Sequence, residues 1–170
     1  IHLGTAVVLG WDPATRIGAF TGVVDDNADA KIASKATAKT LLDGGADVVL
    51  PIAGQASVGA ADAVREKRTA LLVWDGNDVY ETLPPEFRGI LLTSIVKKAD
   101  NAIANIVTDA EAGLFSPAPY RGTLANQGVT IAPPHSLEPD VSSELAQELE
   151  QLRAQLVSGL IAAGPPGLAR

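Results

Sequence analysis

The chain has 170 residues, of which 46% are hydrophobic and 19% are charged, and its net charge is −7. This composition is typical of a globular protein with a sizeable core, and the acidic balance argues against a polyanionic partner such as DNA or RNA. The sequence contains no cysteine, which excludes disulfides and thiol catalysis, and no apolar stretch reaches the roughly 20 residues that span a bilayer. The two histidines, His2 and His135, lie far apart, so we predict no histidine-based metal site.

Strand and helix patterns alternate through the first half of the chain. An apolar run at residues 5–9 predicts a first strand, and residues 29–42 predict a helix. Residues 46–52 are apolar and partly β-branched, which predicts a strand buried on both faces. An alanine-rich helix is then expected to begin near Ser57, and residues 69–74 predict another short strand.

The second half continues the alternation. Residues 90–96 predict a strand, residues 97–111 a helix with one apolar side, and residues 120–132 two short extended pieces. The last helix is expected to begin near Asp140 or Ser142. Its apolar stripe consists of Leu145, Leu149, Leu152 and Leu156. Alternation at this spacing predicts the α/β class, with an open parallel sheet flanked by helices on both faces.

Ligands of open parallel sheets bind beyond the carboxyl ends of the strands. Three loops are expected at that edge, at residues 10–12, 53–57 and 75–78, and Lys97 follows the next strand. Together they offer the indole of Trp11, backbone amides, carboxylates, a side-chain amide and an ammonium group. This collection suits a neutral, polyhydroxylated ligand with a flat ring, because a carboxylate accepts two hydrogen bonds from a vicinal diol and an aromatic face stacks on a ring.

The small-residue loop before the second helix has other interpretations. It lacks the G-x-G-x-x-G pattern of dinucleotide sites, since only Gly54 and Gly59 match, and it lacks the Gly-Lys-Ser/Thr of phosphate loops. A tight turn without any ligand remains open, as does a turn-capping role for Asp75. Of the two tryptophans, Trp74 is expected in the core, and Trp11 is the better candidate for a cleft.

No catalytic set is recognisable in the sequence. There is no cysteine nucleophile, no histidine close to a suitable serine, and no G-x-S-x-G motif. We therefore expect neither enzymatic activity nor a cofactor or metal.

Five stretches resemble, in order, the basic membrane lipoprotein (BMP) family, the purine-nucleoside-receptor-like substrate-binding proteins of ABC importers. They are VLGWD, GADVVLPIAG, the aspartate of VWDGND, LLTSIVKKADNAI and YRGTLANQGVTIAP, and the resemblance extends from near residue 7 to about residue 160. It implies a type I periplasmic-binding-protein fold, in which two α/β lobes joined by three crossing segments close on a ligand.

The resemblance implies that the chain corresponds to the second half of such a protein, with the lipoprotein signal and most of the first lobe lying upstream. Residues 1–96 would form the C-terminal lobe, and residues 97–118 a crossing segment and a helix that packs on the first lobe. Residues 119–136 would be returning strands, and residues 137–170 the C-terminal helix and tail. A fragment without the first lobe is expected to expose Ile103, Ile106 and Val107 of the crossing helix, which favours a dimer or an alternative docking of this helix.

The resemblance also implies roles for individual residues. Asp75 would hold ribose hydroxyls, Lys97 would reach the ligand from the crossing segment, and Trp11 would border the cleft. The loop that lines the cleft would consist of Gly54, Gln55, Ala56 and Ser57. The family often has a Gly-Gly-Thr-Gly-like loop there, so the side chain of Gln55 is a departure that bears on which ligand fits.

By this resemblance, the protein would be an extracytoplasmic, lipid-anchored solute-binding protein that binds a nucleoside-like ligand and delivers it to an ABC transporter permease. Two alternatives stay open. One is the ligand-sensing domain of a regulator, which shares the two-lobe fold, and the other is a nucleotide-dependent oxidoreductase.

Overall fold

A four-stranded sheet organises the protein, whose computed structural model describes residues 27–114 and 116–161. The strands lie in the order β1 (Val48–Val49), β2 (Leu71–Gly76), β3 (Leu91–Lys97) and β4 (Val129–Ile131). The first three pair in parallel, and β4 pairs antiparallel with β3. The strand predicted at residues 5–9 lies outside the described residues.

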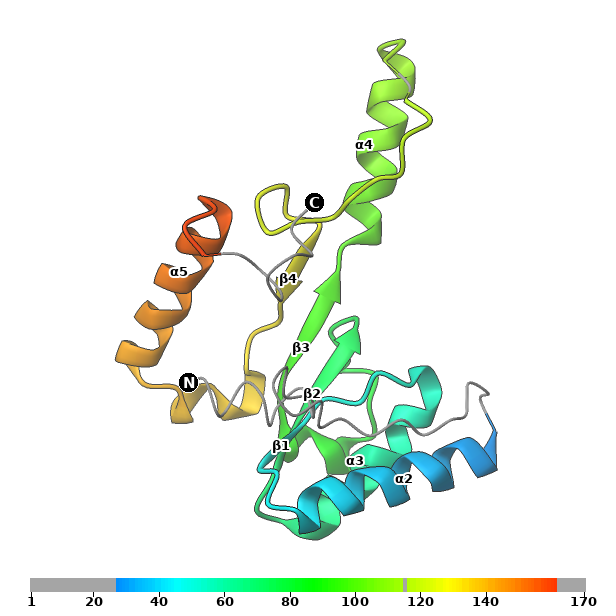
Figure 1. Ribbon diagram of the computed structural model, residues 1–170, viewed down its shortest axis with the longest axis vertical. Helices are drawn as coiled ribbons and strands as arrows, with labels where there is room; N and C mark the ends of the chain where they lie inside the picture. Colours follow the sequence, from blue (N-terminus) through cyan, green and yellow to red (C-terminus); the bar gives the residue numbers. More distant parts are fainter. Residues whose placement is uncertain (1–26, 115, 162–170) are drawn as a thin grey trace.

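The α/β class is confirmed, but the expectation of a wholly parallel sheet is wrong at β4. The helix α4 continues in the direction of β3, and the chain then turns back (Figure 1). The returning chain therefore enters the sheet at the end where β3 leaves it, and Val129 at the start of β4 pairs with Lys97 at the end of β3.

The predicted helices are all present in the described residues. The α-helices are α2 (Ala28–Asp43), α3 (Ser57–Lys67), α4 (Ala99–Glu111) and α5 (Ser143–Val157). Three short 3₁₀ helices are η1 (Gly54–Ala56), η2 (Pro85–Ile90) and η3 (His135–Asp140). The side chains of Asn27 and Ser142 cap α2 and α5 by accepting the amides of Ala30 and Leu145.

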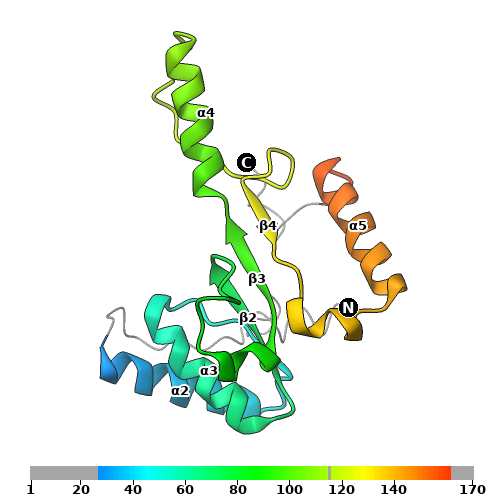
Figure 2. The same ribbon diagram turned by 180° about the vertical axis from the view of Figure 1, so that it is seen from behind.

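The hydrophobic core lies between the sheet and the pair α2 and α3. Figures 1 and 2 show these two helices side by side at one end of the molecule, beside β1 and β2. Fully buried side chains from three different elements meet there, namely Val64, Leu72 and Leu91. The other large buried residues of this core are Leu42, Val49, Trp74, Leu83 and Phe87. The prediction that Trp74 belongs to the core is confirmed.

The close approach of α2 and α3 depends on Gly59. A Cβ atom at this position would overlap the backbone carbonyl oxygen of Lys31 on α2. At the surface of the same contact, Lys35 Nζ donates a hydrogen bond to Glu66 Oε1 at 2.7 Å. This hydrogen bond lowers the pKa of the Glu66 carboxyl group and raises the pKa of the Lys35 ammonium group.

Two predicted strand regions are shorter than expected. The strand expected at residues 46–52 is reduced to Val48 and Val49, because Pro51 has no amide hydrogen to donate and Ile52 is 74% exposed. Of the extended pieces expected at 120–132, only β4 pairs with the sheet. Before it, Asn126 closes a loop with its side chain, accepting the amide of Thr123 and donating to the carbonyl of Arg121.

The helices α4 and α5 contribute no buried residue, and α4 was expected to pack on the first lobe rather than on this sheet. Figure 1 shows α4 projecting beyond the end of β3 and α5 standing apart from the core. On α4, Ile103 is 63% exposed, and Ile106 and Val107 are also exposed. Exposed apolar side chains were expected on this helix. Three leucines of the α5 stripe, Leu145, Leu149 and Leu152, are exposed as well.

Replacing Gly59 by alanine should separate α2 from α3, because the new methyl group collides with backbone rather than with a movable side chain. We expect Gly59→Ala to lower the free energy of unfolding by about 1–3 kcal/mol, although alanine alone favours a helix by about 1 kcal/mol. Urea unfolding followed by circular dichroism measures the change. Gly89→Ala is the matched control, since a Cβ there meets nothing within 4 Å. Equal stability of the two variants would contradict the packing assigned to Gly59.

Candidate functional site

Two of the predicted binding residues, Asp75 and Lys97, lie together at the edge of the sheet where the parallel strands end. Asp75 is the penultimate residue of β2 and lies opposite Ile95 of β3, and Lys97 ends β3. Lys97 Nζ donates to Asp75 Oδ2 at 2.7 Å. The two residues singled out from distant parts of the sequence are therefore direct neighbours.

Asp75 lies within β2, whereas the sequence placed it in a turn-rich loop. Its side chain is 18% exposed, while that of Lys97 is 63% exposed. The turn chemistry belongs instead to Asp78, whose Oδ1 accepts the backbone amide of Tyr80 at 3.3 Å. Among the described residues, Asp75 accepts a bond from Lys97 and caps no backbone amide, which leaves its second oxygen, Oδ1, without a described partner.

The small-residue loop between β1 and α3 divides into a buried and an exposed part. Ala56 and Ser57 are buried, and the Ser57 hydroxyl accepts the amide of Ala53 at 3.3 Å. Gly54 and Gln55 are exposed, and Gly54 has a φ of +53°, in the left-handed region that favours glycine. Of the four predicted loop residues, Gly54 and Gln55 are thus accessible from solvent, whereas the side chains of Ala56 and Ser57 pack or hydrogen-bond within the protein.

Trp11 and the loop at residues 10–12 lie outside the described residues, so their part of the predicted site stays a prediction. Within residues 27–114 and 116–161, no group of three or more histidine, cysteine or acidic side chains is arranged to hold a metal ion. In the same part of the chain, no helix is both long and apolar enough to cross a membrane.

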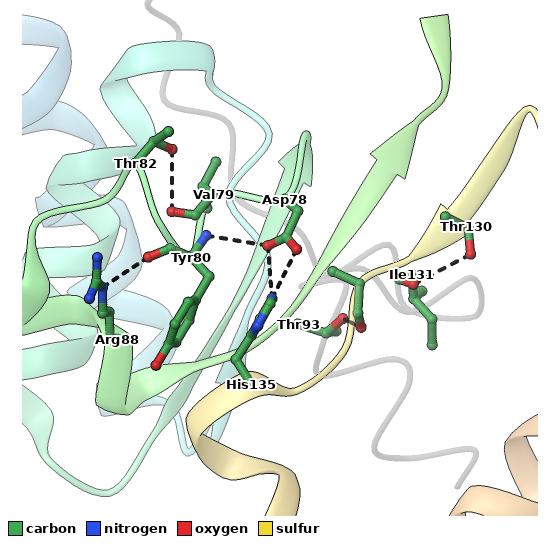
Figure 3. A network of polar contacts seen from close by, with 10 residues as sticks. Asp78, Val79, Tyr80, Thr82, Arg88, Thr93, Thr130, Ile131 and His135 are labelled. Atoms are coloured by element: carbon green, nitrogen blue, oxygen red, sulfur yellow. Dashed lines mark hydrogen bonds and ion pairs between the residues drawn. The ribbon is translucent and has the colours of Figure 1, made fainter. Parts of the chain in front are cut away.

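A polar cluster close to Asp75 was missed in the sequence. It joins the loop after β2 to the start of η3 through Asp78, Tyr80, Arg88 and His135 (Figure 3). Asp78 and His135 are 57 positions apart, so no local spacing signals their contact. The only local signal was the position of Asp78 three residues after Asp75.

A hollow of about 380 Å³ contains none of the predicted site residues. It lies between the start of α4, β4 and α5, and its lining residues are Lys98, Asn101, Gln127, Val129, Thr130 and Arg153. Asp75 and Lys97 lie outside this hollow, at the carboxyl edge of the parallel strands.

Among the solved structures with a similar fold are two solute-binding proteins and a transcriptional activator. The chain superimposes on an ABC transporter solute-binding protein from Aeropyrum pernix K1 with a TM-score of 0.66 and 20% identity, covering 89% of this chain and 48% of that chain. An ABC transporter solute-binding protein from Conexibacter woesei DSM 14684 gives 0.65 and 18%, with 86% and 45% covered. A transcriptional activator of the comK gene from Bacillus halodurans gives 0.63 and 15%, with 78% and 44% covered.

The chain therefore spans about half the length of these structures, and at such identities the likeness shows the fold alone. No curated protein matches it in sequence. A family model, described as the ABC transporter substrate-binding protein PnrA-like family, matches residues 16–159. Because this match covers most of the chain, the protein belongs to the Bmp family of PnrA-like ABC transporter substrate-binding proteins.

Proposed function

We propose that this chain supplies one wall of the ligand cleft in an extracytoplasmic solute-binding protein, which binds a nucleoside or a similar small polar ligand and leaves it chemically unchanged. The observation that carries the proposal is the pair Asp75 and Lys97 at the carboxyl edge of the parallel strands. Family membership supports the general role, and the choice of a nucleoside rests on the family resemblance, with which the chemistry of this pair is compatible.

The Asp75 carboxylate suits a vicinal diol. One of its oxygens accepts a hydrogen bond from Lys97, and the other has no described partner, so the carboxylate is oriented yet retains acceptor capacity. Its low exposure strengthens the hydrogen bonds of an incoming hydroxyl pair relative to those of a fully solvated carboxylate. Lys97, which is largely exposed, can turn toward the same ligand when the cleft closes.

Gln55 is proposed to contribute to ligand choice. It follows Gly54 at the exposed tip of η1, and its amide can both donate and accept hydrogen bonds. A glycine there would leave more room, so Gln55 would favour a smaller ring or one with a complementary polar edge. Trp11 would add an aromatic face to the same cleft.

The remaining parts of the protein follow the same proposal. Residues 1–96 would form the C-terminal lobe, residues 97–118 and 119–136 would cross to and from the other lobe, and residues 137–170 would complete the fold. A lipid anchor would hold the whole protein at the cell membrane beside the permease of an ABC importer. The chain by itself would dimerise through the exposed apolar face of α4.

Replacing Asp75 by alanine should weaken nucleoside binding by at least about tenfold, since hydrogen bonds to a charged group contribute about 1.5–3 kcal/mol each. Asp75→Asn should lose less, because the amide oxygen keeps acceptor capacity. Calorimetric titration of purine and pyrimidine nucleosides into a two-lobe protein containing this chain measures both variants. Asp62→Ala, which removes a carboxylate paired with Arg65 on α3, is the control. Unchanged affinity in Asp75→Ala would overturn the site.

The ion pair between Asp75 and Lys97 should contribute little to stability. Because Lys97 is largely exposed, we expect a coupling energy of about 0.2–1 kcal/mol in a double-mutant cycle of Asp75→Ala and Lys97→Ala. Urea unfolding of the two single variants and the double variant gives this energy. A coupling energy of several kcal/mol would mean that the ion pair mainly stabilises the fold, which would contradict its assignment to ligand binding.

A nucleoside incubated with the two-lobe protein should be recovered unchanged, because no described residue set forms a nucleophile with its base at the site. Chromatography of the products after prolonged incubation tests this. Sustained turnover would favour an enzyme, and affinity for NAD in a fluorescence titration would specifically favour an oxidoreductase.

The second candidate is the ligand-sensing domain of a transcriptional regulator, which the likeness to the comK activator from Bacillus halodurans favours. The two candidates differ in the sequence upstream of the ligand-binding lobes. A helix-turn-helix domain there would favour the regulator, and a lipoprotein signal would favour the importer.

A further inference from the structure

We propose that His135 is a positioning residue. Its side chain ties the segment after β4 to the loop that follows β2, and this loop begins next to Asp75 at the ligand-binding edge of the sheet. The proposal deepens the proposed function, on which its ligand-binding consequence rests. The tie itself is a feature of the fold and stands on four sets of contacts.

The first contact is between His135 and Asp78. Nε2 of His135 lies 2.9 Å from Oδ2 and 3.1 Å from Oδ1 of the carboxylate, so its N–H donates to both oxygens. Oδ1 of Asp78 also accepts the amide of Tyr80, so the same carboxylate shapes its own loop and holds the histidine. Figure 3 shows the imidazole pointing from the start of η3 toward this loop.

The second contact is a stack of three planar groups. The rings of His135 and Tyr80 lie 4.2 Å apart at an angle of 14°, and the guanidinium of Arg88 lies 5.1 Å from the centre of the Tyr80 ring. Arg88 Nε also donates to the Tyr80 carbonyl at 3.0 Å. Tyr80 is thereby held between a cation and an imidazole, an arrangement that favours one orientation of the loop.

The third contact extends the tie to the next residue of η3. The Ser136 hydroxyl donates to the carbonyl of Arg88 at 3.0 Å, so two successive residues of η3 bind the segment between β2 and β3. The fourth lies just before η3, where Ala132 donates its amide to the Ser94 carbonyl and accepts the Thr93 hydroxyl at 2.6 Å.

The backbone of His135 supports a specific role for its side chain. Its φ is +47°, in the left-handed region where a residue with a Cβ is strained and glycine is not. A histidine at this position therefore costs conformational energy that the contacts of its ring offset. If the turn alone mattered, glycine would serve better.

The geometry connects the tie to ligand binding. Asp75 is held by Lys97 at the end of β3, and Asp78, three residues later, is held by His135 beyond the end of β4. Because β3 and β4 pair with each other, both ends of this short loop are fastened to the same two-stranded ribbon. Displacement of the ribbon during closure of a cleft would move Asp75 and the loop together.

Two variants test the tie. His135→Gly removes the ring and relaxes the strained backbone, and Asp78→Asn weakens the contact with His135 while keeping an acceptor for the Tyr80 amide. We expect amide hydrogen exchange at residues 77–81 and 133–140 to rise by about tenfold or more in each variant, with α2 and α3 unchanged. Asp62→Asn, the same change at an ion-paired aspartate on α3, is the matched control and should leave both segments protected.

Exchange that stays unchanged in both variants would overturn the tie, as would a rise spread evenly over α2 and α3, which would mean general destabilisation. In the two-lobe protein, nucleoside affinity should fall by about three- to tenfold in His135→Gly. The loop after β2 would be more mobile in the free variant, so that ordering it on binding would cost more conformational entropy. Unchanged affinity beside faster loop exchange would overturn the positioning role. If the unaltered protein binds no nucleoside, the proposed function fails, and hydrogen exchange still decides the tie.

Discussion

The parallel pairing of β2 with β3 is the constraint on which the other features of the described structure depend. It places Leu72 and Leu91 opposite each other in the core and brings Asp75 and Lys97 to the same edge. The register shifts between Leu72 and Val73, so that Leu72 pairs with Leu91, Val73 with Thr93, and Asp75 with Ile95.

The protein consists of one well-packed region and two helices that lack a packing partner among the described residues. The well-packed region, built on α2, α3 and the parallel strands, supplies nearly all of the buried hydrophobic side chains. By contrast, α4 and α5 bury none, although each has apolar residues along one side. Burial of apolar surface stabilises a protein by roughly 25 cal/mol per Å², so such faces are favourable only when another surface covers them. The structures that this chain resembles are about twice as long.

The two polar contacts, of Lys97 with Asp75 and of His135 with Asp78, differ in the part of the fold that brings the partners together. Lys97 reaches Asp75 from a neighbouring strand, whereas His135 reaches Asp78 from a segment that has left the sheet and returned around α4. The first contact follows from strand pairing. The second requires that the segment between residues 98 and 128 returns the chain to the sheet at the position that brings His135 to Asp78. The strained backbone of His135 is consistent with a position set by such distant contacts rather than by local preference.

The sequence by itself determined the alternation of elements and the residue types at the strand ends. The helices at residues 28–43 and 57–67 were predictable because alanine-rich periodic segments and their end signals are local properties. The candidate pair Asp75 and Lys97 was predictable because each residue directly follows an apolar run, and parallel strands end at a common edge.

Only the tertiary structure decided the direction of β4, the shortening of the strand at residues 46–52, and the contact of His135 with Asp78. Strand direction depends on where the chain returns after α4, and strand length depends on which neighbouring backbone groups are in reach, neither of which is encoded in local periodicity. The contact between His135 and Asp78 joins residues that are 57 positions apart. Their sequence neighbours specify only turns, and the chemistry of this cluster arises because folding brings those turns together.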